Sequence, residues 1–303
     1  MTQPELPLET PIRPRAPGPS WMLISGLVVI AAGIALASPI LHYMVLHWLS
    51  SDGDYTHGLM IIPLALYFAF ERRDRLRQVP IETSWWGLVP LTLGSIALAI
   101  GRLGVELTSM RSGVILTGIG LVLLLFGRQV FRVLAFPLLF LFLMVPLPQS
   151  LVNTIAFPLQ LLAAQMAVSA LHLLGIPALL EGNIIHLAHS ELFVAQACSG
   201  LRSLMALITL GVVFAYFLER GIVRRAIIIA STIPIAILVN ALRVALTAIL
   251  AHHYGSTVAT GAIHDYQGLI MFGFAFLLLL AETNLLKALP WWREAPGSGG
   301  PTP

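Results

Sequence analysis

Charged residues are scarce in this chain: Asp, Glu, Lys and Arg together make up only 10% of its 303 residues, whereas hydrophobic residues make up 57%. Soluble globular domains carry about 25% charged residues, so the composition excludes that class. Several apolar runs approach the roughly 20 residues that a helix needs to cross a bilayer. The composition therefore predicts an all-α polytopic membrane protein whose partner is the lipid bilayer.

Cysteine is nearly absent, because Cys198 is the only one in the chain. A single cysteine excludes an intramolecular disulfide framework. The formal net charge is only +3, and basic residues are what orient membrane helices, so the charge gives no reason to expect a nucleic-acid partner. The function must therefore be sought in the few polar residues that the apolar runs carry.

Eight apolar segments are expected to cross the membrane. They are 21–46, 59–70, 85–100, 114–126, 133–145, 201–218, 226–250 and 269–286. A ninth apolar run, 155–174, is broken by Pro158 and carries polar residues. The flanking tails, 1–20 and 289–303, are rich in Pro and Gly and are expected to be disordered and cytoplasmic, which leaves 21–288 as one transmembrane domain.

Basic residues predict how this domain is oriented. If the N-terminus is cytoplasmic, 13 of the 17 Lys and Arg residues fall on the cytoplasmic side, as the positive-inside rule requires. The chain must then cross outward once and inward once between Arg132 and Arg220. The run 155–174 is therefore expected to be an interfacial or re-entrant helix on the outer side, beside about eight crossings. Four arginines oppose the rule and lie toward the outer side: Arg102, Arg111, Arg202 and Arg243.

Cys198 lies between a polar stretch and an apolar run, at the expected start of a helix near the outer membrane boundary. The N-terminus of a helix favours negative charge, which lowers the pKa of a thiol and populates the reactive thiolate. A lone cysteine is about as often a small buried hydrophobe. Cys198 is therefore a candidate nucleophile that needs support from other residues.

Two further polar groups are expected on the same side of the membrane. Asn240 and Arg243 are three residues apart, so they share one face of the helix 226–250. A charged residue within a membrane helix is costly and indicates a functional site, although Arg243 is also near enough to the interface to snorkel. His264 opens the last helix, where Gly268 allows close backbone approach one turn later. Taken alone, His264 is more often an exposed loop histidine.

A thiol, a guanidinium and an imidazole on one side of a membrane suit acyl transfer through a thioester. Cys198 supplies the nucleophile, and His264 takes and returns a proton. Arg243 orients the substrate carbonyl and stabilises an oxyanion, an effect that grows where water is partly excluded. No cofactor is needed for this chemistry.

Weaker candidates surround this set. Arg202 lies one helical turn after Cys198, where it depresses the thiol pKa, holds an acidic substrate residue, or is simply an interfacial structural arginine. Tyr55 and His57 either line the site or shape the entry of a helix. His252 and His253 lie near His264, but they lack a cysteine or carboxylate at ligand spacing, so no metal is expected.

Several of these residues stand in motifs that resemble the exosortase/archaeosortase family of membrane cysteine proteases and transpeptidases. The matching elements are Ala197-Cys198-Ser199-Gly200-Leu201-Arg202-Ser203, Asn240-x-x-Arg243, His264 with Gly268, Asp54-Tyr55-Thr56-His57-Gly58, Val145-Pro146-Leu147-Pro148 and Glu181-Gly182-Asn183. The resemblance covers nearly the whole chain, from about Trp21 to Leu286.

The resemblance implies a catalytic set of Cys198, Arg243 and His264 facing the periplasm from a bacterial inner membrane. It also implies a substrate class: exported proteins with a C-terminal sorting signal, made of a Pro-Glu-Pro-like motif, a transmembrane helix and a basic cluster. Such enzymes occur in Gram-negative bacteria that make extracellular polysaccharide. Whether water or an amine resolves the thioester stays open, as does the oligomeric state.

Two other functions fit the same residues. A transporter or flippase for a polysaccharide precursor would use Arg243 and Arg102 to bind an anionic lipid, and Cys198 would be dispensable. A membrane acyltransferase would carry a lipid thioester on Cys198 without any protein substrate. Against both, the chain lacks the matched pairs of broken helices that transporters carry.

Overall fold

The computed structural model describes residues 20–49, 57–188, 190–194, 201–219, 221–255 and 262–288. Within these ranges most residues are helical, as the composition predicts. The tails that we expect to be disordered lie outside the described residues, except for Ser20, which begins the first helix.

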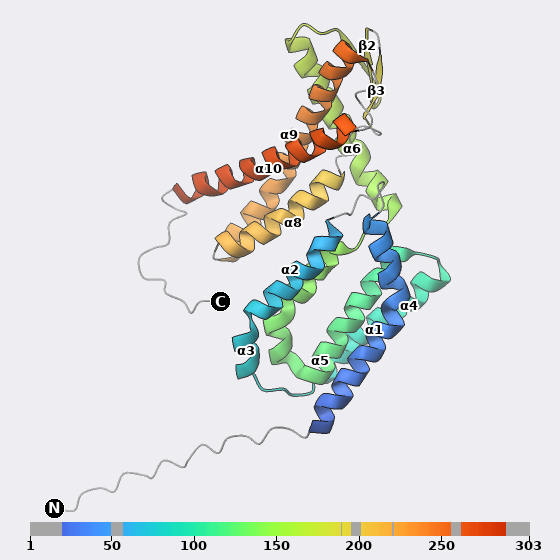
Figure 1. The fold of residues 1–303 in the computed structure, drawn as a ribbon, viewed down its shortest axis with the longest axis vertical. Coiled ribbons are helices and arrows are strands. Elements are labelled where there is room, and N and C mark those ends of the chain that lie inside the picture. Colours follow the sequence, from blue (N-terminus) through green and yellow to red (C-terminus); the bar gives the residue numbers. More distant parts are fainter. Residues whose placement is uncertain are drawn as a thin grey trace, which may run out of the picture.

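The helices form two groups, which Figure 1 shows one above the other. The N-terminal group comprises α1 (Ser20–Leu49), α2 (Gly58–Glu71), α3 (Arg73–Gln78), the 3-10 helix η1 (Trp85–Gly87), α4 (Leu88–Leu103), α5 (Leu107–Phe140) and the 3-10 helix η2 (Leu141–Met144). The C-terminal group comprises α6 (Gln149–Leu173), β1 (Ala178–Glu181), β2 (Ile184–Leu187), β3 (Glu191–Phe193), α8 (Leu201–Leu218), α9 (Ile222–Tyr254) and α10 (Ala262–Ala288).

Helix α5 reverses its direction at Gly127, so that its two halves lie side by side in Figure 1. The backbone of Gly127 is far from helical, with φ 86° and ψ −178°. Only glycine adopts this region without a steric cost. A Cβ atom here would also lie 1.9 Å from the carbonyl oxygen of Glu82. The reversal explains why the sequence shows two apolar segments, 114–126 and 133–145, although α5 carries a single label.

The first half of α5 packs closely on α4 because glycines face each other. A Cβ on Gly94 would lie 2.8 Å from the carbonyl oxygen of Gly113, and one on Gly120 would lie 2.5 Å from the amide nitrogen of Leu91. Small residues let helix backbones approach closely where no hydrophobic effect drives association. At the start of α5, Glu106 accepts hydrogen bonds from the amides of Thr108 and Ser109. Burial raises the pKa of Glu106, but these bonds outweigh it and bring it to about 2.

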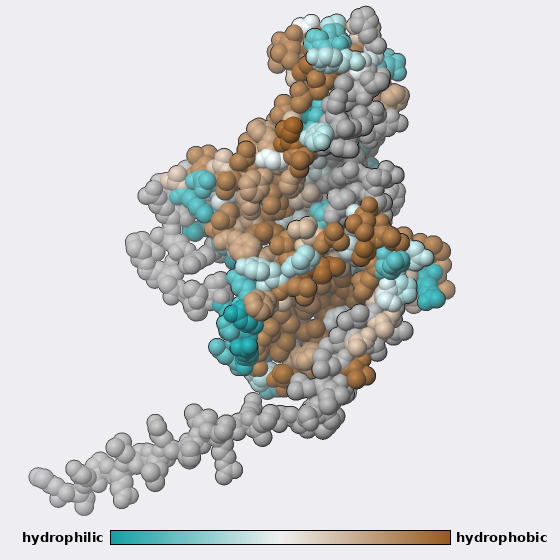
Figure 2. All heavy atoms as spheres, viewed as in Figure 1, coloured by the Kyte–Doolittle hydropathy of each residue, from teal (hydrophilic) through white to brown (hydrophobic). Residues whose placement is uncertain are grey.

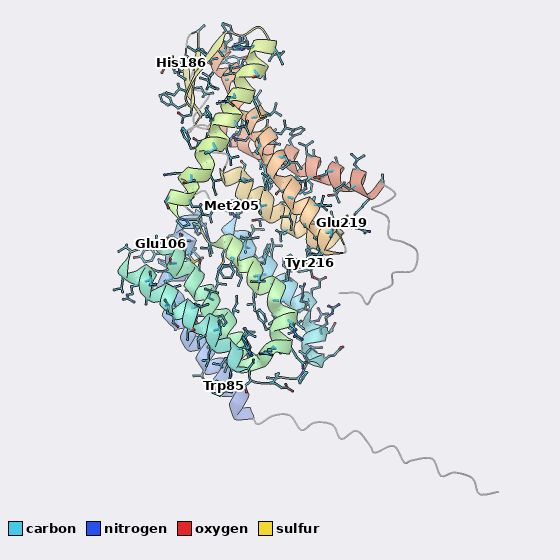
Figure 3. The ribbon with its side chains drawn as sticks, turned by 180° about the vertical axis from the view of Figure 1, so that it is seen from behind. Trp85, Glu106, His186, Met205, Tyr216 and Glu219 are labelled. Atoms are coloured by element: carbon cyan, nitrogen blue, oxygen red, sulfur yellow. The ribbon has the colours of Figure 1, made fainter. Side chains whose placement is uncertain are left out.

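The two groups of helices meet around the aromatic residues Phe68 of α2 and Tyr216 of α8. Their ring centroids are 4.6 Å apart. The hydroxyl of Tyr216 donates a 2.7 Å hydrogen bond to the carboxylate of Glu71, and the Arg72 guanidinium lies 5.0 Å from the Tyr216 ring. Nearer the start of α8, Met205 packs against both the N-terminal and the C-terminal cores (Figure 3). Helix α8 therefore joins the two groups.

Several helix ends that carry basic residues come together in space. Arg72 at the end of α2 and Arg225 at the start of α9 both lie over the ring of Tyr216 near the end of α8. Lys287 at the end of α10 lies 3.8 Å from the carboxylate of Glu219, just after α8. Figure 2 shows hydrophilic residues at α3 and at the end of α10, with others at the top of the C-terminal group and at the turn between α4 and α5, around a largely apolar surface. Basic residues of α2, α9 and α10 therefore gather around the end of α8.

A small sheet corrects the purely helical prediction. The polar stretch before Cys198, which contains Glu181 and His186, forms three antiparallel strands in the order β1-β2-β3. Glu181 pairs with Ile184 across a two-residue loop that begins with Gly182 at φ 61°. Glycine first in such a loop is typical of a type II′ hairpin turn. Ile185 is fully buried against α6 and α9, while His186 (Figure 3) lies between the carboxylates of Glu181 and Glu191.

The predicted number of crossings is not confirmed. Five helices in the described residues are long and apolar enough to cross a membrane, and three apolar helical segments are shorter: 37–46, 58–71 and 203–218. Helix α6 is one of the five, so its interfacial or re-entrant placement is not confirmed either. The segment is helical, as expected, and α6 continues through Pro158. A proline removes one helix hydrogen bond and its ring crowds the carbonyl four residues earlier, but packing offsets this cost, since alanines of α6 such as Ala163 are fully buried against α9.

The reversal of α5 predicts an unusual sensitivity to one methyl group. Gly127→Ala should lower stability by at least about 1–3 kcal/mol, because it strains the backbone and collides with Glu82. The matched control is Gly118→Ala in the first half of α5, where an added Cβ meets nothing within 4 Å. This change should be neutral or stabilising by up to about 1 kcal/mol. Apparent melting temperatures in detergent compare the two, and an equal response would contradict a tight reversal at Gly127.

Candidate active site

The segment that carries Cys198 is held at both ends by ordered structure. Before it, Val194 is fully buried and its amide donates a 3.0 Å hydrogen bond to the carbonyl of Asn183. After it, α8 begins at Leu201, as the apolar run predicts. Cys198 itself lies outside the described residues. Its position three residues before α8 keeps the expectation of a thiol near a helix N-terminus, whose N–H groups favour the thiolate.

Arg243 and Asn240 lie on one face of α9, as their spacing predicts. Both line a small cavity of about 10 Å³, which is about the volume that one water molecule needs. Asn240 is only 5% exposed, and among the described residues its Oδ1 atom has no hydrogen-bond partner. Ser203 of α8 lines the same cavity. The cavity therefore places the guanidinium and the amide beside the first turn of α8.

Helix α10 completes the cavity from the third side. The Gly268 position faces Arg243, because a Cβ added there would lie 3.5 Å from Nη2. Met271 and Ala275, further along the same face of α10, also line the cavity. His264 belongs to the first turn of α10, about 6 Å along the axis before Gly268 and on the same face. The side chain of His264 lies outside what the structure describes.

A buried hydrogen bond fixes α10 against α9 at this level. The Thr247 hydroxyl, one turn after Arg243, donates to Oε1 of Gln267 at 3.0 Å. Both residues are buried, at 0% and 5% exposure. The bond adjoins Gly268, so it sets the register of the helix face that carries His264. Sequence reasoning missed Gln267 and Ser203, although both stand inside the motifs around His264 and Cys198.

Of the weaker candidates, the structure describes His57 but not Tyr55 or the side chain of Arg202. His57 lies directly before α2, close to the backbone of Leu143 in η2, and so belongs to the N-terminal group of helices. Within the ranges that the structure describes, no three His, Cys, Asp or Glu residues gather closely enough to hold a metal ion.

The arrangement brings three helices to one point: the start of α8, the middle of α9 and the start of α10. A comparison with family models matches residues 47–281 to the transmembrane exosortases, which is well over half of the chain. The chain belongs to the transmembrane exosortase family. It matches no curated protein and no solved structure at a level that identifies a relative.

The matched region gives the exosortase context for this cavity. It begins near the end of α1 and stops within α10, so it includes the segment of Cys198, the Asn240–Arg243 face of α9 and the start of α10. The resemblance that the sequence motifs carry is thus confirmed at the level of the family. Among the residues that the structure describes, the contact between Arg243 and Gly268 lies nearest to the expected catalytic set.

This contact predicts that the size of the side chain at position 268 controls where the Arg243 guanidinium lies. If Arg243 stabilises an oxyanion, as the resemblance implies, Gly268→Leu should push the guanidinium aside and lower the processing of a co-expressed sorting-signal protein by about 100-fold or more, which is what loss of an oxyanion donor costs. Gly268→Ala should be tolerated, because a Cβ there makes only ordinary van der Waals contact.

The matched control is Gly273→Leu in the same helix, because a Cβ at Gly273 meets nothing within 4 Å. Immunoblots should show equal amounts of all three variants in the membrane. If both leucine variants process the substrate equally well, Gly268 does not position Arg243.

Proposed function

We propose that this exosortase is a membrane-embedded cysteine peptidase or transpeptidase that cleaves the C-terminal sorting signal of exported proteins. The observation that carries the proposal is the contact between Arg243 and the Gly268 position of α10. It places a guanidinium beside the helix start that carries His264. Ser203, five residues after Cys198, lines the same cavity, so Cys198 and Ser203 have Cα atoms no more than about 17 Å apart.

The proposed cycle uses the three residues in sequence. The Cys198 thiolate adds to the scissile carbonyl carbon, and His264 holds the proton that the thiol has lost. Arg243 stabilises the negative charge that develops on the carbonyl oxygen, inside a cavity that admits little water. The C–N bond then breaks, His264 gives the proton to the leaving amine, and Cys198 retains the acyl group as a thioester.

A second nucleophile completes the reaction. Water attacking the thioester gives hydrolysis, and an amine gives transpeptidation, with the thiol released in either case. Asn240 has a buried amide in the same cavity, where it suits binding of the substrate backbone. Arg202 lies one turn after Cys198 and suits an acidic residue of the sorting signal, while Tyr55, His57 and Gly268 support the site.

The proposed orientation places the site in the periplasm of a bacterium with an inner membrane. The support is that basic residues at the ends of α2, α9 and α10 meet Tyr216 and Glu219 at the end of α8, which fits one cytoplasmic side. In this orientation 21–288 forms one transmembrane domain with about eight crossings, α6 is an interfacial or re-entrant helix on the outer side, and the tails 1–20 and 289–303 are cytoplasmic. The partners are the bilayer and exported proteins with a sorting signal.

The nucleophile predicts the most direct mutational result. Cys198→Ser should abolish processing in cells at normal protein level, because serine is far less nucleophilic at neutral pH. Ser199→Ala, which alters the adjacent side chain, should keep most of the activity. Processing is measured as the size shift of a co-expressed substrate on immunoblots. Full processing by Cys198→Ser would contradict the proposal and favour a transporter, whereas acyl-lipid labelling of Cys198 without any protein substrate would favour an acyltransferase.

The role of Arg243 predicts intolerance of a change that keeps its charge. Arg243→Lys should lower turnover by about 10²–10³-fold, because lysine lacks the planar fork of donors that stabilises an oxyanion. Membrane insertion should be unchanged. The control is Arg102→Lys at the end of α4, where an interfacial arginine should accept lysine, since both side chains snorkel. Near-normal turnover by Arg243→Lys would leave Arg243 as a membrane anchor only.

A further inference from the structure

A second and much larger cavity lies at the other end of the N-terminal helices. Its volume is about 510 Å³, and it is formed by the loop before α4 and the start of the second half of α5. The lining includes Glu82, Ser84, Trp85, Trp86, Arg128 and Arg132. In Figure 3, Trp85 lies at the opposite end of the α4–α5 hairpin from Glu106. The cavity is therefore separate from the site around Arg243.

The charges of this cavity suit a singly charged anion. Arg128 and Arg132 are one turn apart and lie on the same face of the helix that starts after Gly127. The N-terminus of that helix adds partial positive charge. In the described part of the chain neither guanidinium forms an ion pair, and Arg128 stacks 4.9 Å from the Trp86 ring centroid. Glu82 offsets one arginine, which leaves one net positive charge in the lining.

The surface beside the cavity is apolar and faces away from the protein. Trp85 and Trp86 are 79% and 63% exposed, and tryptophan gathers at membrane interfaces. Helix α4 continues this surface with exposed Val89, Leu93 and Ile96. Their spacing of four and three residues places them on one helix face. The cavity thus adjoins an exposed apolar strip that runs along α4 from Trp85 and Trp86.

We propose that this cavity binds the headgroup of a glycerophospholipid. The phosphodiester lies between Arg128 and Arg132, and the acyl chains lie along the exposed strip of α4. A phosphodiester carries one negative charge, which matches the single net positive charge of the lining. A phosphate monoester carries about −1.5 to −2 at neutral pH, and free phosphate has nothing to place on the apolar strip. The bound lipid anchors the turn at Gly127 in one leaflet of the membrane. This binding does not depend on which reaction the distant site performs.

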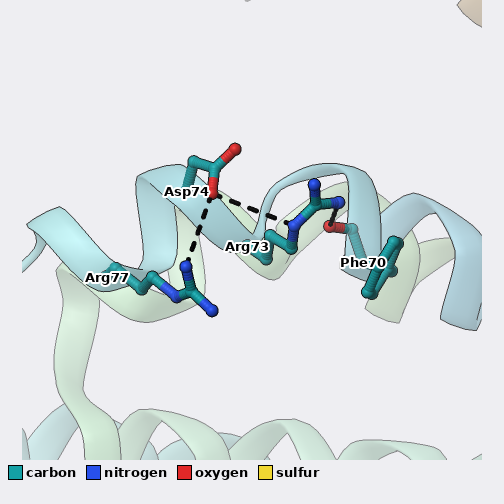
Figure 4. A network of polar contacts seen from close by, with 4 residues as sticks. All are labelled: Phe70, Arg73, Asp74 and Arg77. Atoms are coloured by element: carbon teal, nitrogen blue, oxygen red, sulfur yellow. Dashed lines mark hydrogen bonds and ion pairs between the residues drawn. The ribbon is translucent and has the colours of Figure 1, made fainter.

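Native mass spectrometry of the purified full chain in detergent tests the proposal. Phosphatidylglycerol is the probe, diacylglycerol with the same acyl chains lacks the phosphodiester, and inorganic phosphate is the competitor. The test variant is Arg128→Gln/Arg132→Gln. The matched control is Arg73→Gln/Arg77→Gln, because these two arginines lie in α3 and reach Asp74 at 3.9 Å each, outside the cavity (Figure 4).

The wild-type chain should retain one phosphatidylglycerol, and the affinity should fall at least about tenfold in the test variant and stay unchanged in the control. Diacylglycerol should not be retained, and millimolar phosphate should not displace the lipid. Arg132→Gln alone keeps the stacking of Arg128 on Trp86, so it should fold normally and still weaken binding. Equal losses in both arginine pairs, retention of diacylglycerol, or displacement by phosphate would each overturn the proposal.

Discussion

A guanidinium in the middle of an apolar helix is the constraint on which the C-terminal half of the structure depends. Arg243 cannot be left among lipid chains, because a charge at membrane depth is costly unless it faces a protein interior or polar groups. The chain meets this demand by placing Arg243 against Gly268, where no side chain occupies the space. Asn240 and Ser203 line the same small cavity. The start of α8, the face of α9 and the start of α10 are thereby brought to one point.

The opposite helix ends hold this arrangement in place. The Tyr216–Glu71 hydrogen bond and the arginines stacked on Tyr216 join α2, α8 and α9, and Lys287 joins the end of α10 to Glu219. Small residues provide the remaining contacts, since Ala163 of α6 and Ala248 of α9 are both fully buried in one core. Polar contacts at the Tyr216 end and close packing along the helices hold the bundle together. The opposite ends, near Arg243, are then free to form the site.

Apolar runs in the sequence predicted the elements around the site well, because such runs mark membrane helices directly. Helix α8 has the predicted bounds, and α10 begins just before His264, as expected. The small sheet was not predicted, although Gly182-Asn183 is a hairpin signal, because its strands are only three or four residues long and alternate weakly. Helix α6 continues through Pro158, since packing on α9 holds it together. The contact of Arg243 with Gly268 depends on tertiary packing, and no local pattern encodes it.

A disulfide cross-link tests most directly whether the three helix starts form one site. The chain has a single natural cysteine, so His264→Cys creates a chain with just two. If Cys198 and residue 264 face each other, mild oxidation should join them, because a disulfide needs Cα atoms about 4.4–6.8 Å apart. Tyr266→Cys, on an exposed position of the same helix, should not cross-link. Efficient bonding at 264 and none at 266, measured by protease digestion and mass spectrometry, is the result we predict. Bonding at 266 with none at 264 would contradict a shared site.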